Sequence, residues 1–168
     1  DAIAAELEQH VDLSALLHLA VDVPCHEPSE EQKDVPARCR IAVAMDQACS
    51  FYYQDNLDEL VAAGAELRYF SPLNDRVLPE ADGLYLGGGY PELHLSRLSQ
   101  NETMRESIRR AIENGMPTVA ECGGFLYLQS ALKDEKGTLW PMVGALGGTG
   151  YGTDRLQRFG YLTLTGAR

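Results

Sequence analysis

Cys122 is the residue whose local sequence best fits a catalytic nucleophile. It follows the apolar run at residues 117–120 and precedes Gly123-Gly124, so we expect a strand to end and a helix to begin there. The residues two before and two after it, Ala120 and Gly124, are small, as the tight turn of a nucleophile elbow requires. A thiol at such a turn can attack a carbonyl carbon. A buried structural cysteine beside a glycine turn would have the same local sequence.

The expected turn would also assist the chemistry of Cys122. The N-terminus of the following helix would favour the thiolate over the thiol. The amide N–H of Gly123 would lie beside any oxygen that becomes negative during attack. Both effects are typical of acyl transfer from an amide or ester.

A glycine triplet, Gly87 to Gly89, directly follows a second apolar run at residues 83–86. Alone, such a triplet after a strand is usually a turn. Glycine lets backbone amides approach a ligand closely. If both apolar runs are neighbouring parallel strands, Gly88 or Gly89 would supply the second half of an oxyanion hole, and the sequence does not distinguish between the two.

Strands and helices alternate around these segments. The expected strands are residues 40–44, 66–70, 83–86 and 117–120, and the expected helices are residues 56–63, a longer one after Asn101 and one from Gly123. This alternation predicts an α/β fold, with a mostly parallel central sheet and helices on both faces. The later stretch from Gly144 to Gly152 has no phosphate-binding spacing, and we interpret it as a mobile loop.

The first 38 residues follow a different pattern. Residues 2–9 and a segment capped by Asp12 are expected to be short helices, and residues 24–38 are rich in proline and polar side chains, as linkers are. We therefore place a domain boundary at the linker. The chain lacks an initiator Met and begins inside the first expected helix, which suggests a piece of a longer protein.

Composition excludes several classes of function. A formal net charge of -11 argues against nucleic acid as a partner, and no apolar run approaches the roughly 20 residues of a membrane span. The first six residues have no basic region followed by an apolar core, so we do not expect them to be a signal peptide. The four cysteines form no CxxC pair, so we expect no metal site, reduced thiols and a cytoplasmic location.

Several motifs together resemble one known family. In order along the chain they are Ala44-Met45-Asp46, Phe51-Tyr52-Tyr53, Phe70-Ser71-Pro72-Leu73, residues 82–92 (DGLYLGGGYPE) and Ala120-Glu121-Cys122-Gly123-Gly124. They are similar to the glutaminase domain of cobyrinic acid a,c-diamide synthases, from about Arg40 to about Tyr161. So many motifs in the same order make the resemblance specific.

The resemblance implies a class I, triad-type glutamine amidotransferase with a flavodoxin-like sheet. Residues 39–168 would be the glutaminase domain, incomplete at its carboxy-terminal end, and residues 1–38 the end of a synthetase domain and its linker. Cys122 would attack glutamine, with Gly88, Gly89 and Gly123 as candidate oxyanion donors. Ammonia would pass to the synthetase domain, where ATP and magnesium activate the a and c carboxylates of a corrin precursor of cobalamin. No cofactor is implied for this fragment itself, and the resemblance is compatible with a homodimer.

The resemblance also leaves alternatives open. The family's catalytic histidine lies in a carboxy-terminal segment, whereas this chain offers only His10, His18, His26 and His94. We therefore expect neither efficient glutamine hydrolysis nor ATP chemistry from this polypeptide alone. The parent enzyme could instead be a cobyric acid synthase or a nickel-sirohydrochlorin a,c-diamide synthase. A non-catalytic relative used for binding or regulation is a further alternative.

Overall fold

The computed structural model describes residues 2–20, 36–155, 157 and 163 of the chain. They belong to two compact units, Asp1–Lys33 and Asp34–Arg168. The first unit contains α1 (Ala2–His10) and α2 (Leu13–Ala20), and the Asp12 carboxylate caps α2 by accepting the Ala15 N–H at 2.9 Å. Both expected helices are thus confirmed. None of the helices in the described residues has the length and apolarity needed to cross a membrane.

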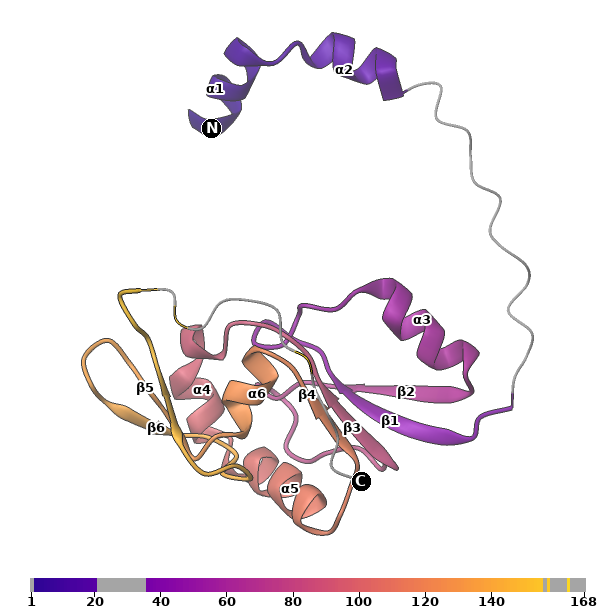
Figure 1. Cartoon of the computed structure of the whole chain (residues 1–168), viewed down its shortest axis with the longest axis vertical. Coiled ribbons are helices and arrows are strands. Elements are labelled where there is room, and N and C mark those ends of the chain that lie inside the picture. Colours follow the sequence, from indigo (N-terminus) through magenta and orange to yellow (C-terminus); the bar gives the residue numbers. More distant parts are fainter. Residues whose placement is uncertain (1, 21–35, 156, 158–162, 164–168) are drawn as a thin grey trace. The chain divides into compact units, whose positions relative to one another are not determined.

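The second unit is built on a parallel sheet of four strands (Figure 1). The order across the sheet is β2-β1-β3-β4, with β1 at Cys39–Ala44, β2 at Ala65–Phe70, β3 at Gly83–Leu86 and β4 at Thr118–Ala120. All three neighbouring pairs run parallel. Because β3 lies beside β4, the two segments with candidate chemistry end at the same edge of the sheet.

Helices flank this sheet, which confirms the α/β class. They are α3 (Gln54–Ala62), the 3-10 helix η1 (Pro91–Leu93), α4 (Leu95–Gln100), α5 (Glu102–Glu113) and α6 (Gly123–Leu128). Alternate strand residues face opposite sides. Ala42, Ala44 and Leu86 join the core formed with α4, α5 and α6, whereas Ile41 and Val119 line a hollow of about 430 Å³ with Leu60 of α3.

The core lies mainly on the face covered by α4, α5 and α6. Met104 and Ile108 of α5 are fully buried, and Ile112 packs partly against the same cluster. This spacing of i, i+4 and i+8 is the apolar stripe expected of the helix after Asn101. Tyr127 of α6 is also fully buried, so α6 is held firmly behind the elbow that precedes it.

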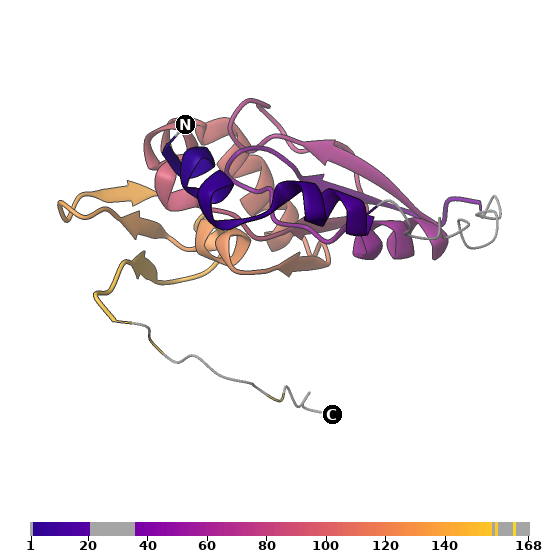
Figure 2. The same cartoon turned by 90° about the horizontal axis from the view of Figure 1, so that it is seen from above.

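A second, three-stranded sheet lies beside α4 and α6, away from α3 (Figure 2). Its order is β6-β5-β7, with β5 at Ala131–Lys133, β6 at Leu139–Pro141 and β7 at Thr149–Tyr151. The interpretation of Gly144 to Gly152 as a mobile loop was therefore wrong in part, because β7 pairs with β5. Gly150 allows this packing: a methyl group there would lie 2.5 Å from Leu132 Cδ2.

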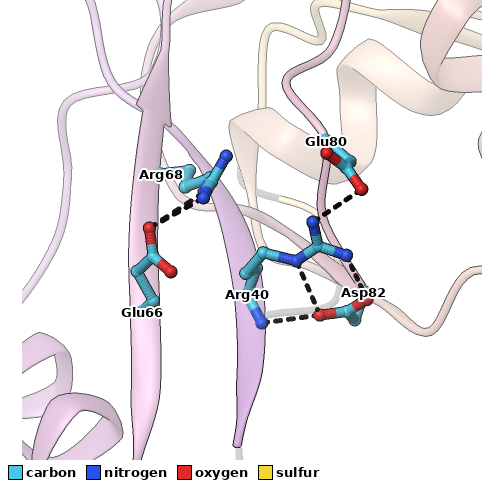
Figure 3. A network of polar contacts seen from close by, with 5 residues as sticks. All are labelled: Arg40, Glu66, Arg68, Glu80 and Asp82. Carbon is cyan, nitrogen blue, oxygen red and sulfur yellow. Dashed lines mark hydrogen bonds and ion pairs between the residues drawn. The ribbon is translucent and has the colours of Figure 1, made fainter. Parts of the chain in front are cut away.

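A polar network fixes β3 against β1 at the edge opposite the glycine loop (Figure 3). The Arg40 guanidinium donates to both Asp82 oxygens, at 3.1 and 2.8 Å, and pairs with Glu80 at 2.7 Å. The Asp82 carboxylate also accepts the backbone N–H of Arg40 at 2.8 Å. These hydrogen bonds to Arg40 lower the pKa of Asp82 to about 2. The network therefore joins β1 to the segment that leads into β3.

Candidate active site

Cys122 occupies a strained turn between β4 and α6. Its φ of 47° and ψ of -110° make it the one residue other than glycine with a positive φ among the described residues. Such a conformation costs on the order of 1–3 kcal/mol and is typical of functional turns. The residue is exposed and its thiol is free, so the sulfur is not enclosed by the core. The local geometry is that of the expected nucleophile elbow.

The two glycines after Cys122 are required by close backbone contacts. A methyl group on Gly123 would lie 2.4 Å from the Gly89 carbonyl oxygen, and one on Gly124 would lie 2.2 Å from the Leu86 carbonyl oxygen. Real Cβ atoms do not approach backbone atoms so closely. The elbow therefore rests directly on the backbone that follows β3.

Hydrogen bonds join the same two segments. Gly124 donates its N–H to the Gly87 carbonyl at 3.0 Å, and Glu121 donates to the Leu86 carbonyl at 2.9 Å. The structure thus brings together Cys122, Gly123 and the glycine triplet, as the sequence predicted. Their placement on neighbouring parallel strands is the reason.

The other side of the glycine triplet contacts the loop after β1. A methyl group on Gly89 would lie 2.0 Å from the Ala48 carbonyl oxygen, and the Phe51 N–H donates to the Gly88 carbonyl at 3.0 Å. Three backbone segments are therefore layered at this edge: residues 48–51, the triplet and the elbow.

Several backbone N–H groups at this edge are available. Within the described part of the chain, the N–H groups of Gly88, Gly89 and Gly123 donate to no protein acceptor, and the Gly88 carbonyl accepts the Phe51 N–H in a β-bridge. The contact between Gly123 and the Gly89 backbone places these two residues side by side. Gly89 and Gly123 are therefore adjacent candidates for oxyanion donors, and Gly88 remains a third candidate beside them.

Two other cysteines test the choice of Cys122. Cys49 is buried, and this burial raises the pKa of its thiol to about 12, so it stays protonated. Cys39 is exposed but lies at the start of β1, at the opposite end of the strand from the glycine loop. Among the described cysteines, only Cys122 combines exposure with the carboxyl edge of the sheet. Cys25 lies outside the described residues.

Asp46 and Glu121 have structural roles in this edge. The Asp46 carboxylate accepts the Ala48 N–H at 2.8 Å and the Cys49 N–H at 3.2 Å, and also the Ser71 hydroxyl and the Leu73 N–H at 2.7 and 2.8 Å. These bonds fix the turn after β1 and join it to the turn after β2. The Glu121 carboxylate accepts a hydrogen bond from the Tyr85 hydroxyl at 2.7 Å.

No histidine ring forms a hydrogen bond with Cys122 among the described residues. His94 is half-buried between η1 and α4, and its ring makes no hydrogen bond to a described residue. His10 and His18 belong to the first unit, and His26 lies outside the described residues.

Tyr52 entered the sequence analysis only as part of the Phe51-Tyr52-Tyr53 motif, and its contacts at the site were not predicted. In the structure its hydroxyl donates to the Ala44 carbonyl and accepts the Gly87 N–H at 2.8 Å. A tyrosine eight residues after the end of a strand carries no recognisable pattern, so only its position in space reveals these contacts.

Residues 40–167 match the model of the CobB/CobQ-like glutamine amidotransferase domain. The chain belongs to this family. The family match begins where the resemblance of the motifs began, and it covers the sheet, the glycine triplet and the elbow. The motifs around Gly87 and Cys122 are thus parts of a CobB/CobQ-like domain.

Curated relatives of this CobB/CobQ-like domain carry the name cobyrinate a,c-diamide synthase. One from Caldanaerobacter subterraneus is 43% identical over 157 residues, covering 93% of this chain and 35% of the relative. One from Dehalococcoides mccartyi is 43% identical over 168 residues, covering 95% and 36%. One from Listeria innocua is 47% identical over 154 residues, covering 90% and 34%. The chain spans about a third of the length of these relatives.

A solved structure shares the fold of this CobB/CobQ-like domain. It is a crystal structure from Listeria monocytogenes, named for peptidase E, with a TM-score of 0.51 and 14% sequence identity. The similarity covers 68% of this chain and 66% of the other. At this identity it supports the fold and nothing further.

Proposed function

We propose that residues 39–168 form the glutaminase portion of a cobyrinate a,c-diamide synthase, with Cys122 as the nucleophile. The observation that carries the proposal is the strained, exposed Cys122 resting on the glycine triplet through Gly123. Family membership and the shared name of the relatives support the choice of glutamine as the substrate.

In the proposed reaction the Cys122 thiolate adds to the side-chain carbonyl carbon of glutamine. A C–S bond forms while the carbonyl π electrons move to oxygen, and the N–H groups of Gly123 and Gly89 donate to that oxyanion. Collapse of the tetrahedral intermediate breaks the C–N bond and releases ammonia after protonation. Water then hydrolyses the thioester to glutamate and restores the thiol. We assign the general base to none of the described histidines.

The same proposal places amide formation outside this unit. ATP and magnesium would act in the synthetase portion, to which residues 1–38 would contribute the last segment and linker. There ammonia would amidate the a and c carboxylates of a corrin precursor in the cytoplasm. No described residue is assigned to ATP or magnesium. Among possible acceptors, the relatives' name favours cobyrinate over the substrates of cobyric acid synthase or the nickel-sirohydrochlorin enzyme.

A labelling experiment tests the proposed nucleophile. The chain is treated with a glutamine analogue that carries a chloroketone in place of the carboxamide, and alkylated peptides are quantified by mass spectrometry. We expect Cys122 to react at least tenfold faster than the exposed Cys39, and excess glutamine to slow only Cys122. Equal rates at both cysteines, without protection by glutamine, would reject the proposal and favour a binding module.

Ammonia release provides a second test. Glutamine hydrolysis is measured for this chain and for the full-length parent enzyme. The proposal expects efficient release from the parent, and its loss in the Cys122→Ala variant of the parent. Release that persists in that variant would require another nucleophile.

A further inference from the structure

We infer that the Tyr52 hydroxyl positions the proposed oxyanion donors, because it holds the glycine triplet, Gly87 to Gly89, beside the turn at Cys122. The effect of Tyr52 on the reaction rests on the proposed glutaminase function. Its effect on the position of the glycine triplet rests on the contacts of Tyr52 alone.

The Tyr52 hydroxyl bridges the ends of two neighbouring strands. The pairing of β1 with β3 extends to Val43 and Tyr85. Just beyond it, the hydroxyl donates to the Ala44 carbonyl and accepts the Gly87 N–H at 2.8 Å. The one hydroxyl thus provides a hydrogen-bond partner both for the carbonyl at the end of β1 and for the N–H of the first glycine of the triplet. Burial raises the pKa of this hydroxyl, so it remains protonated and able to donate at neutral pH.

Contact with the Tyr52 ring also explains the first glycine of the triplet. A methyl group on Gly87 would lie 2.4 Å from ring atoms Cε1 and Cζ and 2.9 Å from the hydroxyl oxygen. The Gly87 backbone therefore rests on the aromatic ring itself. The absence of a side chain at this position serves the contact with Tyr52 rather than a ligand.

Residues 51 and 52 hold consecutive residues of the triplet. The Phe51 N–H donates to the Gly88 carbonyl at 3.0 Å, while Tyr52 receives the N–H of Gly87. The next residue, Gly89, then has its backbone nitrogen beside Gly123, where a methyl group on Gly123 would lie 2.9 Å from it. The orientation of the proposed donor thus depends on the two hydrogen bonds before it.

The Tyr52 ring is connected to the elbow through Tyr85. It packs edge-on against Tyr85, with ring centroids 5.2 Å apart and an interplanar angle of 87°. Tyr85 donates to Glu121, the neighbour of Cys122. Tyr52 therefore contacts the triplet directly and the elbow through Tyr85, which links the two parts of the site.

The test compares two probes that differ in one respect. With the chloroketone glutamine analogue the thiolate first adds to the ketone carbon, which gives an oxyanion, and the sulfur then displaces chloride from the neighbouring CH2 carbon as the ketone re-forms; iodoacetamide instead loses iodide by direct displacement, without an oxyanion. In Tyr52→Phe we expect the maximal rate of Cys122 labelling by the analogue to fall about tenfold, with its half-saturating concentration changed less than twofold. The iodoacetamide rate of Cys122 should stay within twofold. If the substitution only disturbed the structure around Cys122, the rates of labelling by both probes would change together.

Tyr53→Phe is the matched control. Tyr53 is 70% exposed, and its hydroxyl makes no hydrogen bond to a described residue. This variant should behave like the wild type with both probes. Hydrogen exchange of the Gly87 amide, measured by NMR, should accelerate at least tenfold in Tyr52→Phe and remain unchanged in Tyr53→Phe.

The outcomes separate the inference from the proposed function. If wild-type Cys122 shows no selective labelling, the proposed function fails, and the exchange of the Gly87 amide still decides whether Tyr52 positions the loop. If the wild type is labelled selectively and Tyr52→Phe matches it in rate and exchange, the inference on Tyr52 is overturned while the proposed function stands.

Discussion

Gly123 and Gly89 touch backbone to backbone, so closely that a methyl group on Gly123 would lie 2.4 Å from the Gly89 carbonyl oxygen. This contact joins the turn after β4 to the turn after β3. It places two amide N–H groups, neither donating to an acceptor in the described residues, beside the strained Cys122. The candidate site is therefore made by two adjacent backbone turns, with few side chains in it.

The contact at Gly124 predicts a large loss of stability on substitution. In Gly124→Ala the new methyl group would lie 2.2 Å from the Leu86 carbonyl oxygen, and backbone atoms cannot move aside cheaply. We expect the free energy of unfolding to fall by about 1–3 kcal/mol, measured by urea denaturation. The control is Gly147→Ala, where no atom lies within 4 Å. Equal stability of the two variants would contradict the close contact.

The positive φ of Cys122 predicts that its conformation is costly. Cys122→Gly should be more stable than Cys122→Ala by about 1 kcal/mol, because glycine adopts a φ of 47° without strain. Both variants lose the thiol, so the difference between their stabilities reports the cost of the positive φ at this position. Thermal unfolding of both proteins is the measurement. An alanine variant as stable as the glycine variant would show that the turn is not strained.

The network at Arg40 predicts a dependence of stability on pH. Hydrogen bonds from Arg40 hold the pKa of Asp82 at about 2, below its ordinary value of 3.8. A carboxylate with a lowered pKa stabilises the fold above its unfolded pKa and loses this effect as pH falls through its folded pKa. The wild type should therefore have a higher Tm than Asp82→Asn above about pH 4.

Measuring the Tm of the wild type and of Asp82→Asn as a function of pH checks this prediction. The difference in Tm between the two proteins should shrink as pH is lowered from about 4 to about 2, and high salt should reduce it at neutral pH, because the group is exposed. A difference that is independent of pH would show that the Asp82 charge is not the cause.

The buried stripe of α5 predicts an ordinary core effect. Ile108→Ala should lower the free energy of unfolding by about 2–5 kcal/mol, because the side chain is fully buried and its loss leaves a cavity. Leu139→Ala, at a position 59% exposed, serves as the control and should cost far less. Denaturant titration distinguishes them. Comparable losses would place Ile108 outside the core.

The sequence by itself determined the fold class, the strands that end at the site and Cys122 as the candidate nucleophile. These features follow from local rules: apolar periodicity defines each strand and helix, and small residues around a cysteine define a tight turn. Alternation with helices then predicts parallel strands, whose carboxyl ends lie at one edge of the sheet, whereas the order that makes β3 and β4 neighbours was seen only in the structure.

Only the tertiary structure decided what each glycine does and how the edge is held. Gly87 rests on the Tyr52 ring, Gly88 bridges to Phe51, and Gly89 lies against Ala48 and Gly123. It also decided that Gly144 to Gly152 contains β7, and that Cys49 is buried while Cys122 is exposed. Each of these depends on contacts between residues far apart in the chain. A glycine has the same local signature whether it serves a mobile loop, a ligand or a neighbouring ring.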